Sequence, residues 1–565
     1  MNKGTTKLIL IWSFSLLFLI SLYVNIVLLH YQTDPFIPTT IKIAQLVSKF
    51  GSLESAQQYV TGNWHYSGWQ GHTIDFLRYE PLSGILVYEI SSVTGFKINT
   101  VAYFPLPLLI YVIMLYIISK LIYNLLPEKI KIEKNIMIFV LSVGMYAYIG
   151  RFVMGTFYVL EYHGIYYVYA LMLYYSLFKI IQDQGNYQNS TKLTFLIAIV
   201  FLANLFDHYE IPITFTGGVI IFAVVVHLFD NIFIRHDNKL QKKLRNLIII
   251  FMILILSNPF YYGALTRSAG LIQTVSLFFS TLANRLIEPR AGGQVTQLYP
   301  YANYLLLSIK MWHLGFLVII ISHMLFLTRL IKKNKNVSVS ATIFLYILIL
   351  GQEISWIISY FSMYLSSFAL QLKNAWLLNS LVIIPLLFFN RTISTRWKRI
   401  GMYILVTTLT LTLVTWTIIY MHMTVEGYSP YSGQVKQEVR TVSFFLQNEI
   451  EDHYGIITGS LQSTSTIYED LSLDKLAYWY PVIGSYFMQK QHTKFHLPVY
   501  EIYLQLKQNA NIFVISTQEF KNGLYPGLYV APLNRDEVES LNKILVFNEN
   551  SIYTSDLVRI YMLQK

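Results

Sequence analysis

The sequence predicts a polytopic α-helical membrane protein that ends in a small α/β domain, and three observations support this prediction. The chain of 565 residues is 54% hydrophobic and only 13% charged, whereas a soluble globular protein carries about 25% charged residues. Apolar runs of roughly 20 residues, the length that crosses a bilayer, recur as far as residue 421. After residue 421 the pattern is polar and mixed. We therefore expect a membrane domain over 1–421 and an α/β domain over 422–565.

About eleven membrane-spanning helices are expected from these runs. The first is read as an uncleaved span, because no small-residue cleavage site follows it. Lys and Arg concentrate in alternate connections, which is typical of cytoplasmic loops. This places the N-terminus in the cytoplasm, the protein in the plasma membrane and the C-terminal domain outside. The expected spans are 8–30, 99–125, 135–150, 164–182, 193–206, 212–234, 246–262, 303–330, 340–360, 374–390 and 401–421.

A first outer loop over 31–98 follows from this topology. Within it, the apolar segment 81–96 is short and contains Glu89, so it is expected as a helix lying in the membrane interface. The C-terminal domain is expected to hold a helix at 433–452 and a buried strand at 511–516. Two further strands are expected at 543–550 and 557–563, on either side of a turn near 550–556.

Charge and cysteine content exclude several classes of site. The formal net charge is +12, but the basic residues stand in short loops between apolar runs, which is not the pattern of a nucleic-acid-binding protein. Cys is absent, so disulfides and thiolate metal sites are excluded.

Asp34 is the first residue singled out for chemistry. It follows the first apolar run in "LLHYQTDPFIP", where the chain is expected to leave the bilayer. One interpretation is an N-cap for a helix over 38–50, a common role for Asp. The other is a functional carboxylate at the outer surface.

Other polar side chains gather on the face predicted to be outside. In "LEYHG", Glu161 and His163 are two residues apart and could converge on one cation, with Mg²⁺ or Mn²⁺ as the candidates. The turn "FDHYE" and the stretch "DFLRYE" could line a cleft, or could be ordinary solvated turns. Their candidate substrate-binding residues are Asp207, His208, Glu210, Asp75, Arg78, Tyr79 and Glu80.

Cations that could hold a phosphate follow in the next predicted outer loop. Arginine forks match phosphate oxygens, and an ionisable group inside a span is usually functional. Lys310 could alternatively form a structural ion pair with Glu353. The candidate phosphate-binding residues are Arg267, Arg285, Arg290 and Lys310.

The order of these features resembles the GT-C glycosyltransferases, polytopic enzymes that use polyprenyl-phosphate-linked sugars. The resemblance rests on "TDPFIPTTIKIAQL" after the first span, then "KFGSLESA", then "YEPLSGILVYEISSVTG", with many spans and a C-terminal domain after them. It extends over essentially the whole chain. The chain is distantly similar to oligosaccharyltransferase catalytic subunits and to protein mannosyltransferase-like enzymes.

The resemblance implies roles for three residues. Asp34 would be the catalytic carboxylate, and Glu161 and His163 would bind a divalent metal, with Asp34 as a further ligand. The Trp-Trp-Asp motif of oligosaccharyltransferases is absent, and "YWYPVIG" at 478–484 is the nearest segment. This favours a simpler sugar transferase over transfer to asparagine.

The predicted function is therefore transfer of a sugar from a polyprenyl-phosphate donor to an acceptor hydroxyl at the outer face of the membrane. Asp34 would be the general base, and the acceptor would be a glycan, a lipid or a protein. Two alternatives stay open. One is a polysaccharide polymerase or ligase, and the other is a non-enzymatic lipid or sugar flippase or a structural membrane protein.

Overall fold

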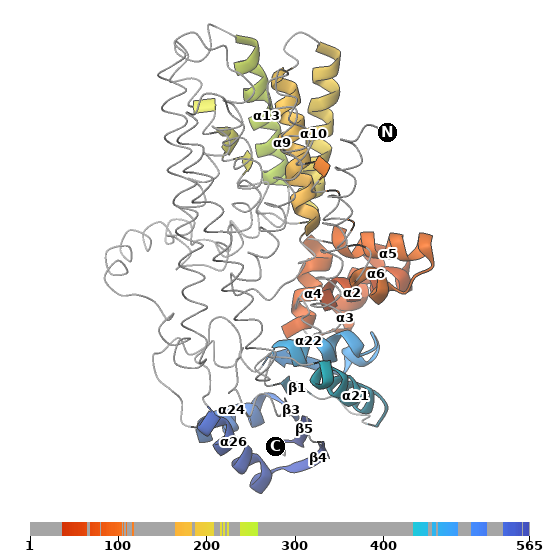
Figure 1. The fold of residues 1–565 in the computed structure, drawn as a ribbon, viewed down its shortest axis with the longest axis vertical. Coiled ribbons are helices and arrows are strands. Elements are labelled where there is room, and N and C mark those ends of the chain that lie inside the picture. The colour runs from red at the N-terminus through yellow and green to blue at the C-terminus, as the bar shows by residue number, and fades with distance from the viewer. Residues whose placement is uncertain are drawn as a thin grey trace, which may run out of the picture.

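The fold was obtained as a computed structural model, shown in Figure 1. It describes three groups of segments, drawn in colour, which come from the early, middle and late parts of the chain. The described residues are 37–64, 68–79, 81–103, 164–182, 187–207, 238–257, 433–449, 455–458, 461–483, 499–516, 535–555 and 558–563, with isolated residues between 106 and 224.

The middle group consists of three helices: α9 (Gly164–Gln182), α10 (Tyr187–Asp207) and α13 (Asn238–Ser257). They lie together at the top of Figure 1, with α10 against both of the others. Aromatic rings fill the space between them. The Phe201 and Phe251 rings stack with their centroids 4.4 Å apart, and Phe215 meets Phe251 edge-on.

None of the helices in the described segments is both long enough and apolar enough to cross a membrane. The reason is visible in their sequences. Tyrosines are distributed along α9, α10 begins with "YQNSTK", and α13 begins with "NKLQKKLR". Within the described residues, their apolar parts are therefore shorter than the roughly 20 predominantly apolar residues that a bilayer requires.

This finding contradicts two predictions, the polytopic membrane fold with about eleven spans and the multi-pass location in the plasma membrane. Helices do occur at the predicted 164–182 and 193–206, and over 246–257 of the predicted 246–262, whose last five residues lie outside the described segments. However, 193–206 is only the apolar part of α10, and 246–257 only the apolar part of α13, and the first turns of both helices are polar. The assignment of loops to an outer and a cytoplasmic side depended on those spans and is withdrawn with them.

The early group is a set of short helices, drawn in red and orange in Figure 1. They are α2 (Ile37–Phe50), α3 (Leu53–Asn63), α4 (Gly68–Tyr79), α5 (Leu82–Thr94) and α6 (Ile98–Tyr103). The helices expected at 38–50 and 81–96 are confirmed as α2 and α5.

A tight turn joins α2 to α3. Gly51 has a left-handed backbone with φ +73°, and its amide donates to the Val47 carbonyl at 2.8 Å, which ends α2. Ser52 then caps α3, with its hydroxyl accepting from the Ser55 amide at 3.1 Å. The "KFGSLESA" segment thus contains the end of α2, the turn at Gly51 and the first residues of α3.

The late group contains a five-stranded mixed sheet in the order β2-β1-β3-β5-β4. β1 pairs in parallel with β2 and β3, and β5 pairs antiparallel with β3 and β4. The strands are β1 (Gly455–Thr458), β2 (Tyr480–Ile483), β3 (Ile512–Ser516), β4 (Asn550–Thr554) and β5 (Val558–Met562). The strands expected at 511–516 and 557–563 are confirmed as β3 and β5.

Alternate residues of each strand point to opposite sides of this sheet. Because apolar side chains occur on both sides, helices cover both faces. Val514 and Ile560 pack with α21 (Gly433–Glu449) and α22 (Leu461–Asp470). Phe513 and Tyr561 pack with α24 (Val499–Asn509) and α26 (Arg535–Asn548). The helix expected at 433–452 is confirmed as α21, whereas the strand expected at 543–550 is wrong, because most of that segment belongs to α26.

The early and late groups share one hydrophobic core. Leu46, Val60 and Trp64 from the early helices are buried in the same cluster as Ile467 and Trp479 from the late group. Figure 1 shows the early helices lying directly on α22, which packs against α2. Residues about 400 positions apart in the chain therefore form a single packed unit. The predicted boundary between 1–421 and 422–565 stays a prediction.

Candidate functional site

The contact between α2 and α22 contains a buried lysine. Lys42 is 1% exposed and lies between Ile41 and Ile43 in a buried stretch of α2. Its Nζ donates to the Glu469 carbonyl at 2.8 Å, to the Leu471 carbonyl at 2.6 Å and to Gln45 Oε1 at 3.1 Å. An ammonium group has three N–H donors, so these acceptors use all of them.

The two carbonyls belong to the C-terminal end of α22. This end of a helix carries a partial negative charge and unpaired carbonyls, so a cation stabilises it. Burial lowers the pKa of Lys42 to about 8, although the nearby carboxylates of Glu469 and Asp470 oppose that shift. At neutral pH the side chain is therefore mostly an ammonium ion that caps a helix from a distant part of the chain.

The carboxylate of Glu469 extends the same cluster to two more helices. It is 3% exposed and accepts from Asn99 Nδ2 at 3.4 Å and from Arg440 Nη2 at 3.2 Å. It also accepts from the Tyr103 hydroxyl. Burial and this carboxylate raise the pKa of Tyr103 well above its usual value, so Tyr103 stays a neutral donor. We call Lys42, Asn99, Tyr103, Arg440 and Glu469 the Lys42–Glu469 cluster.

Charge is balanced in and around the cluster. Arg440 is half-exposed and also approaches Asp470, with Nε 3.7 Å from Oδ2. Two cations, Lys42 and Arg440, thus face two carboxylates, Glu469 and Asp470. A buried charge is tolerated when it is paired and hydrogen-bonded in this way.

A second set of polar contacts joins α4 to the late group. Gln70 is fully buried, and its Nε2 donates to the Leu476 carbonyl and, at 2.8 Å, to the Trp479 carbonyl. The Thr73 and Tyr468 hydroxyls lie 2.6 Å apart. These contacts fix α4 against the end of α22 and the segment that leads from it into β2.

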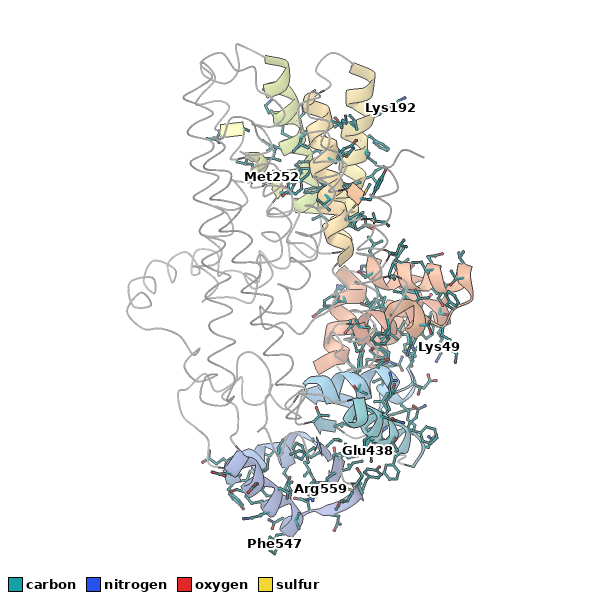
Figure 2. All side chains as sticks on the ribbon, viewed as in Figure 1. Lys49, Lys192, Met252, Glu438, Phe547 and Arg559 are labelled. Atoms are coloured by element: carbon teal, nitrogen blue, oxygen red, sulfur yellow. The ribbon has the colours of Figure 1, made fainter. Side chains whose placement is uncertain are left out.

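An exposed ion pair lies beside these buried contacts. Lys49 Nζ is 2.7 Å from Asp474 Oδ1, and both side chains are largely open to solvent. The hydrogen bond to Asp474 raises the pKa of Lys49 and lowers that of Asp474. Figure 2 labels Lys49 at the boundary between the early helices and the late group. Exposed pairs contribute about 0–1 kcal/mol, so this pair is a suitable control for the buried cluster.

Only part of the predicted site falls in the described segments. Asp75 is half-buried and Arg78 exposed on α4, while Tyr79 is the last residue of α4 and Asp207 the last residue of α10. The predicted residues that lie outside the described segments are Asp34, Glu80, Glu161, His163, His208, Glu210, Arg267, Arg285, Arg290 and Lys310.

The structure therefore does not test the predicted divalent metal. In the described segments no group of three or more His, Asp or Glu could hold a metal ion. Glu161 and His163 lie elsewhere in the chain, so their role as ligands stays a prediction.

The sequence reading missed Lys42, Gln70 and Glu469. A signal for Lys42 was present, because a single lysine between Ile41 and Ile43 in an apolar helix predicts a buried, paired cation. Nothing local identified Glu469 or Gln70, because the contact of Glu469 with Lys42 and the contacts of Gln70 with the late group join residues hundreds of positions apart.

No known family model matches the chain, and no curated protein matches it either. The likeness to GT-C glycosyltransferases therefore rests only on the residues and motifs quoted above.

Proposed function

We propose that the protein is a glycosyltransferase that moves a sugar from a polyprenyl-phosphate donor to an acceptor hydroxyl. One observation carries the proposal: Asp34 stands three residues before the first residue of α2, a helix held by buried contacts on two sides. On one side Lys42 ties α2 to α22, and on the other Gly84 lets α5 pack closely against it. A position close in sequence to a fixed helix suits a carboxylate that must meet a substrate in one geometry.

In this reaction Asp34 is the general base. Its carboxylate accepts the proton of the acceptor hydroxyl while that oxygen attacks the anomeric carbon of the sugar. The bond between the anomeric carbon and the phosphate oxygen breaks, and the polyprenyl phosphate leaves with the bonding electron pair. The charge on the leaving phosphate needs a cation, for which Arg267, Arg285, Arg290 and Lys310 are the candidates.

The test measures sugar transfer by the purified full-length chain, using a panel of polyprenyl-phosphate sugars labelled in the sugar. Loss of a general base lowers the rate by about 10²–10⁴-fold, and we expect this for Asp34→Asn. The matched control is Asp474→Asn, which neutralises another carboxylate, one that is exposed at the surface. The control should transfer at the wild-type rate.

Two results would overturn the proposal. One is undiminished transfer by Asp34→Asn in a folded protein. The other is the failure of the wild-type chain to release polyprenyl phosphate from any donor in the panel.

A further inference from the structure

The connection between α5 and α6 exposes two large apolar side chains. Val93, in the last turn of α5, is 84% exposed, and Phe96, just after the helix, is 55% exposed. Lys97 follows directly and is also exposed. Figure 1 shows α5 and α6 extending to the side of the early group. We call Val93, Phe96 and Lys97 the α5–α6 tip.

The turn at the tip is fixed by its own hydrogen bonds. Gly95 has a left-handed backbone with φ +73°, and its amide donates to the Ser91 carbonyl at 2.8 Å. The Ser91 hydroxyl donates to the Phe96 carbonyl at 2.6 Å. The Thr94 hydroxyl donates to the Ile90 carbonyl at 2.6 Å and lies 3.3 Å from the Phe96 amide. An unpaired backbone group is costly outside water, so these bonds let the turn enter an apolar phase with these groups already paired.

The exposed apolar side chains stand at the end of α5 and not along it. The sequence predicted that the segment 81–96 lies in a membrane interface. In the structure Ser83, Gly84 and Val87 are buried, and α5 packs against α2. The first half of the helix thus contributes to the inside of the protein. This points to a contact at the end of α5 instead of along its length.

The size and charge of the tip select a lipid surface over a protein partner. A buried aromatic side chain covers about 150–250 Å², so Val93 and Phe96 together offer roughly 400 Å² at most. A stable protein interface needs about 800 Å² on each side. A fluid bilayer accepts a small apolar group, and anionic headgroups complement Lys97, whose aliphatic stem can lie beside the acyl chains. The nearest acid in the sequence, Glu89, lies about one turn further back along α5.

We propose that the α5–α6 tip binds a lipid surface, with Val93 and Phe96 among the acyl chains and Lys97 at anionic headgroups. This inference goes beyond the proposed function and does not depend on it. If both hold, the tip brings the chain to the phase that contains the hydrocarbon tail of a polyprenyl-phosphate donor.

The first measurement places a reporter beside the tip without changing it. The chain contains no cysteine, so Ser92→Cys gives the exposed position 92 a single environment-sensitive fluorophore. The probe is a vesicle of phosphatidylcholine and phosphatidylglycerol, with or without a nitroxide on the acyl chains. We expect the emission to shift to shorter wavelength on adding vesicles and to be quenched by the nitroxide. The same label at Thr441→Cys, which is exposed on α21, should show neither change.

Variants of the tip identify the side chains that enter the lipid. In the Ser92→Cys background, Val93→Asp combined with Phe96→Asp should raise the lipid concentration for half-maximal quenching by about 100-fold or more, since burial of one such side chain contributes at least about 10-fold. Phe444→Asp is the matched control, because Phe444 is 71% exposed on α21. It should leave the quenching unchanged. A label at 92 that vesicles never quench overturns the proposal, and so does quenching that survives the double substitution.

The role of Lys97 is tested by changing the headgroups. Vesicles that contain phosphatidylglycerol should bind more tightly than vesicles of phosphatidylcholine alone. Lys97→Gln should weaken binding to the anionic vesicles by about 5-fold, the usual contribution of one lysine at an anionic surface. Lys543→Gln removes an exposed lysine on α26 and should have no such effect. If Lys97→Gln does not reduce the preference for anionic vesicles, Lys97 does not contact the headgroups.

A second copy of the chain is the other partner that the tip could bind. In that case the emission of the label at 92 would shift with protein concentration in the absence of vesicles. Sedimentation velocity would then show a dimer that Phe96→Asp removes, and this result would overturn the assignment to lipid. An emission that does not depend on protein concentration supports it. None of these measurements uses sugar transfer, so the failure of the proposed function leaves them unaffected.

Discussion

At the scale of single residues, Lys42 shows how burial and hydrogen bonding compete. Removal from water disfavours the ammonium form, while three acceptors and two carboxylates nearby favour it. The result is a pKa of about 8 instead of the ordinary 10.5. The side chain is still mainly charged at neutral pH, but it loses its proton at a pH at which an exposed lysine would keep it.

This shift predicts that the contribution of Lys42 to the free energy of unfolding increases as the pH rises from 8 to 9.5. In that range the unfolded chain binds the proton of Lys42 and the folded chain has begun to release it. The free energy of unfolding therefore increases with pH. One proton corresponds to 1.36 kcal/mol per pH unit, so the contribution is at most about 2 kcal/mol. Urea denaturation followed by tryptophan fluorescence measures it, because Trp64 and Trp479 are buried beside the same contact.

The comparison with Lys42→Met isolates this contribution from every other titrating group. The variant should lack the increase between pH 8 and 9.5, whereas Lys49→Met should keep it, since the pKa of Lys49 is raised and not lowered. Tyrosines of the unfolded chain begin to ionise in this range, but wild type and Lys42→Met contain the same tyrosines, so their contribution cancels in the comparison. If the free energy of unfolding increased with pH equally in wild type and in Lys42→Met, the lowered pKa could not belong to Lys42.

At the scale of secondary-structure elements, the packing of α2 on α5 depends on one glycine. A Cβ at Gly84 would lie 2.3 Å from Ile43 Cγ2 and 3.3 Å from the Thr40 carbonyl oxygen. The first distance is too short for unbonded atoms and the second is tight, so a side chain at 84 would push the two helices apart or force Ile43 to move. The "PLSG" motif at the start of α5 is therefore a helix-packing motif, whatever further role it has.

We expect Gly84→Ala to lower the free energy of unfolding by about 1–3 kcal/mol, the usual cost of overpacking a core. Gly62→Ala is the matched control, because Gly62 is exposed on α3 and a Cβ there meets nothing within 4 Å. The control should be stabilised by up to about 1 kcal/mol, since alanine is the better helix former. Thermal or urea denaturation of both variants would measure the difference, and equal stabilities would refute the packing role.

Some of the secondary-structure elements could be predicted from the sequence and others could not. Helices α2, α5 and α21 and strands β3 and β5 were predicted because each has a clear apolar period or a run between turn residues. The segment 543–550 was misread, because "ILVF" alone looks like a strand. Its helical period becomes clear only with Leu541, which is buried with Leu545 while Val546 and Phe547 are exposed. Figure 2 shows Phe547 pointing away from the rest of the molecule.

The membrane prediction failed for a related reason. Apolar runs were read without the polar turns that belong to the same helices, as in α10 and α13. The candidate site was harder still to predict. In the Lys42–Glu469 cluster, the contacts between the early and late groups join residues more than 300 positions apart. A single sequence contains no local signal for such pairs.

At the scale of the whole molecule, the early and late segments behave as one folding unit. The late sheet covers one of its faces with its own helices α24 and α26. On the other face α21 and α22 are present, but the core is completed by residues of α2, α3 and α4. The late segment thus buries part of its apolar surface only after residues 37–103 have packed against it.

This arrangement predicts that the two segments associate when they are produced as separate chains. A chain of residues 433–565 alone should unfold with a broad transition, because Ile467, Tyr468 and Trp479 then lose apolar neighbours from α2 to α4. Adding a chain of residues 37–103 should raise its Tm, since anything that binds only the folded state stabilises it by mass action. Introducing Lys42→Met into the shorter chain should reduce that rise, and Lys49→Met should reduce it less, because its partner is exposed. Melting curves of the longer chain, with and without each form of the shorter one, measure these effects. A Tm that does not respond to residues 37–103 would show that the shared core does not stabilise the late segment.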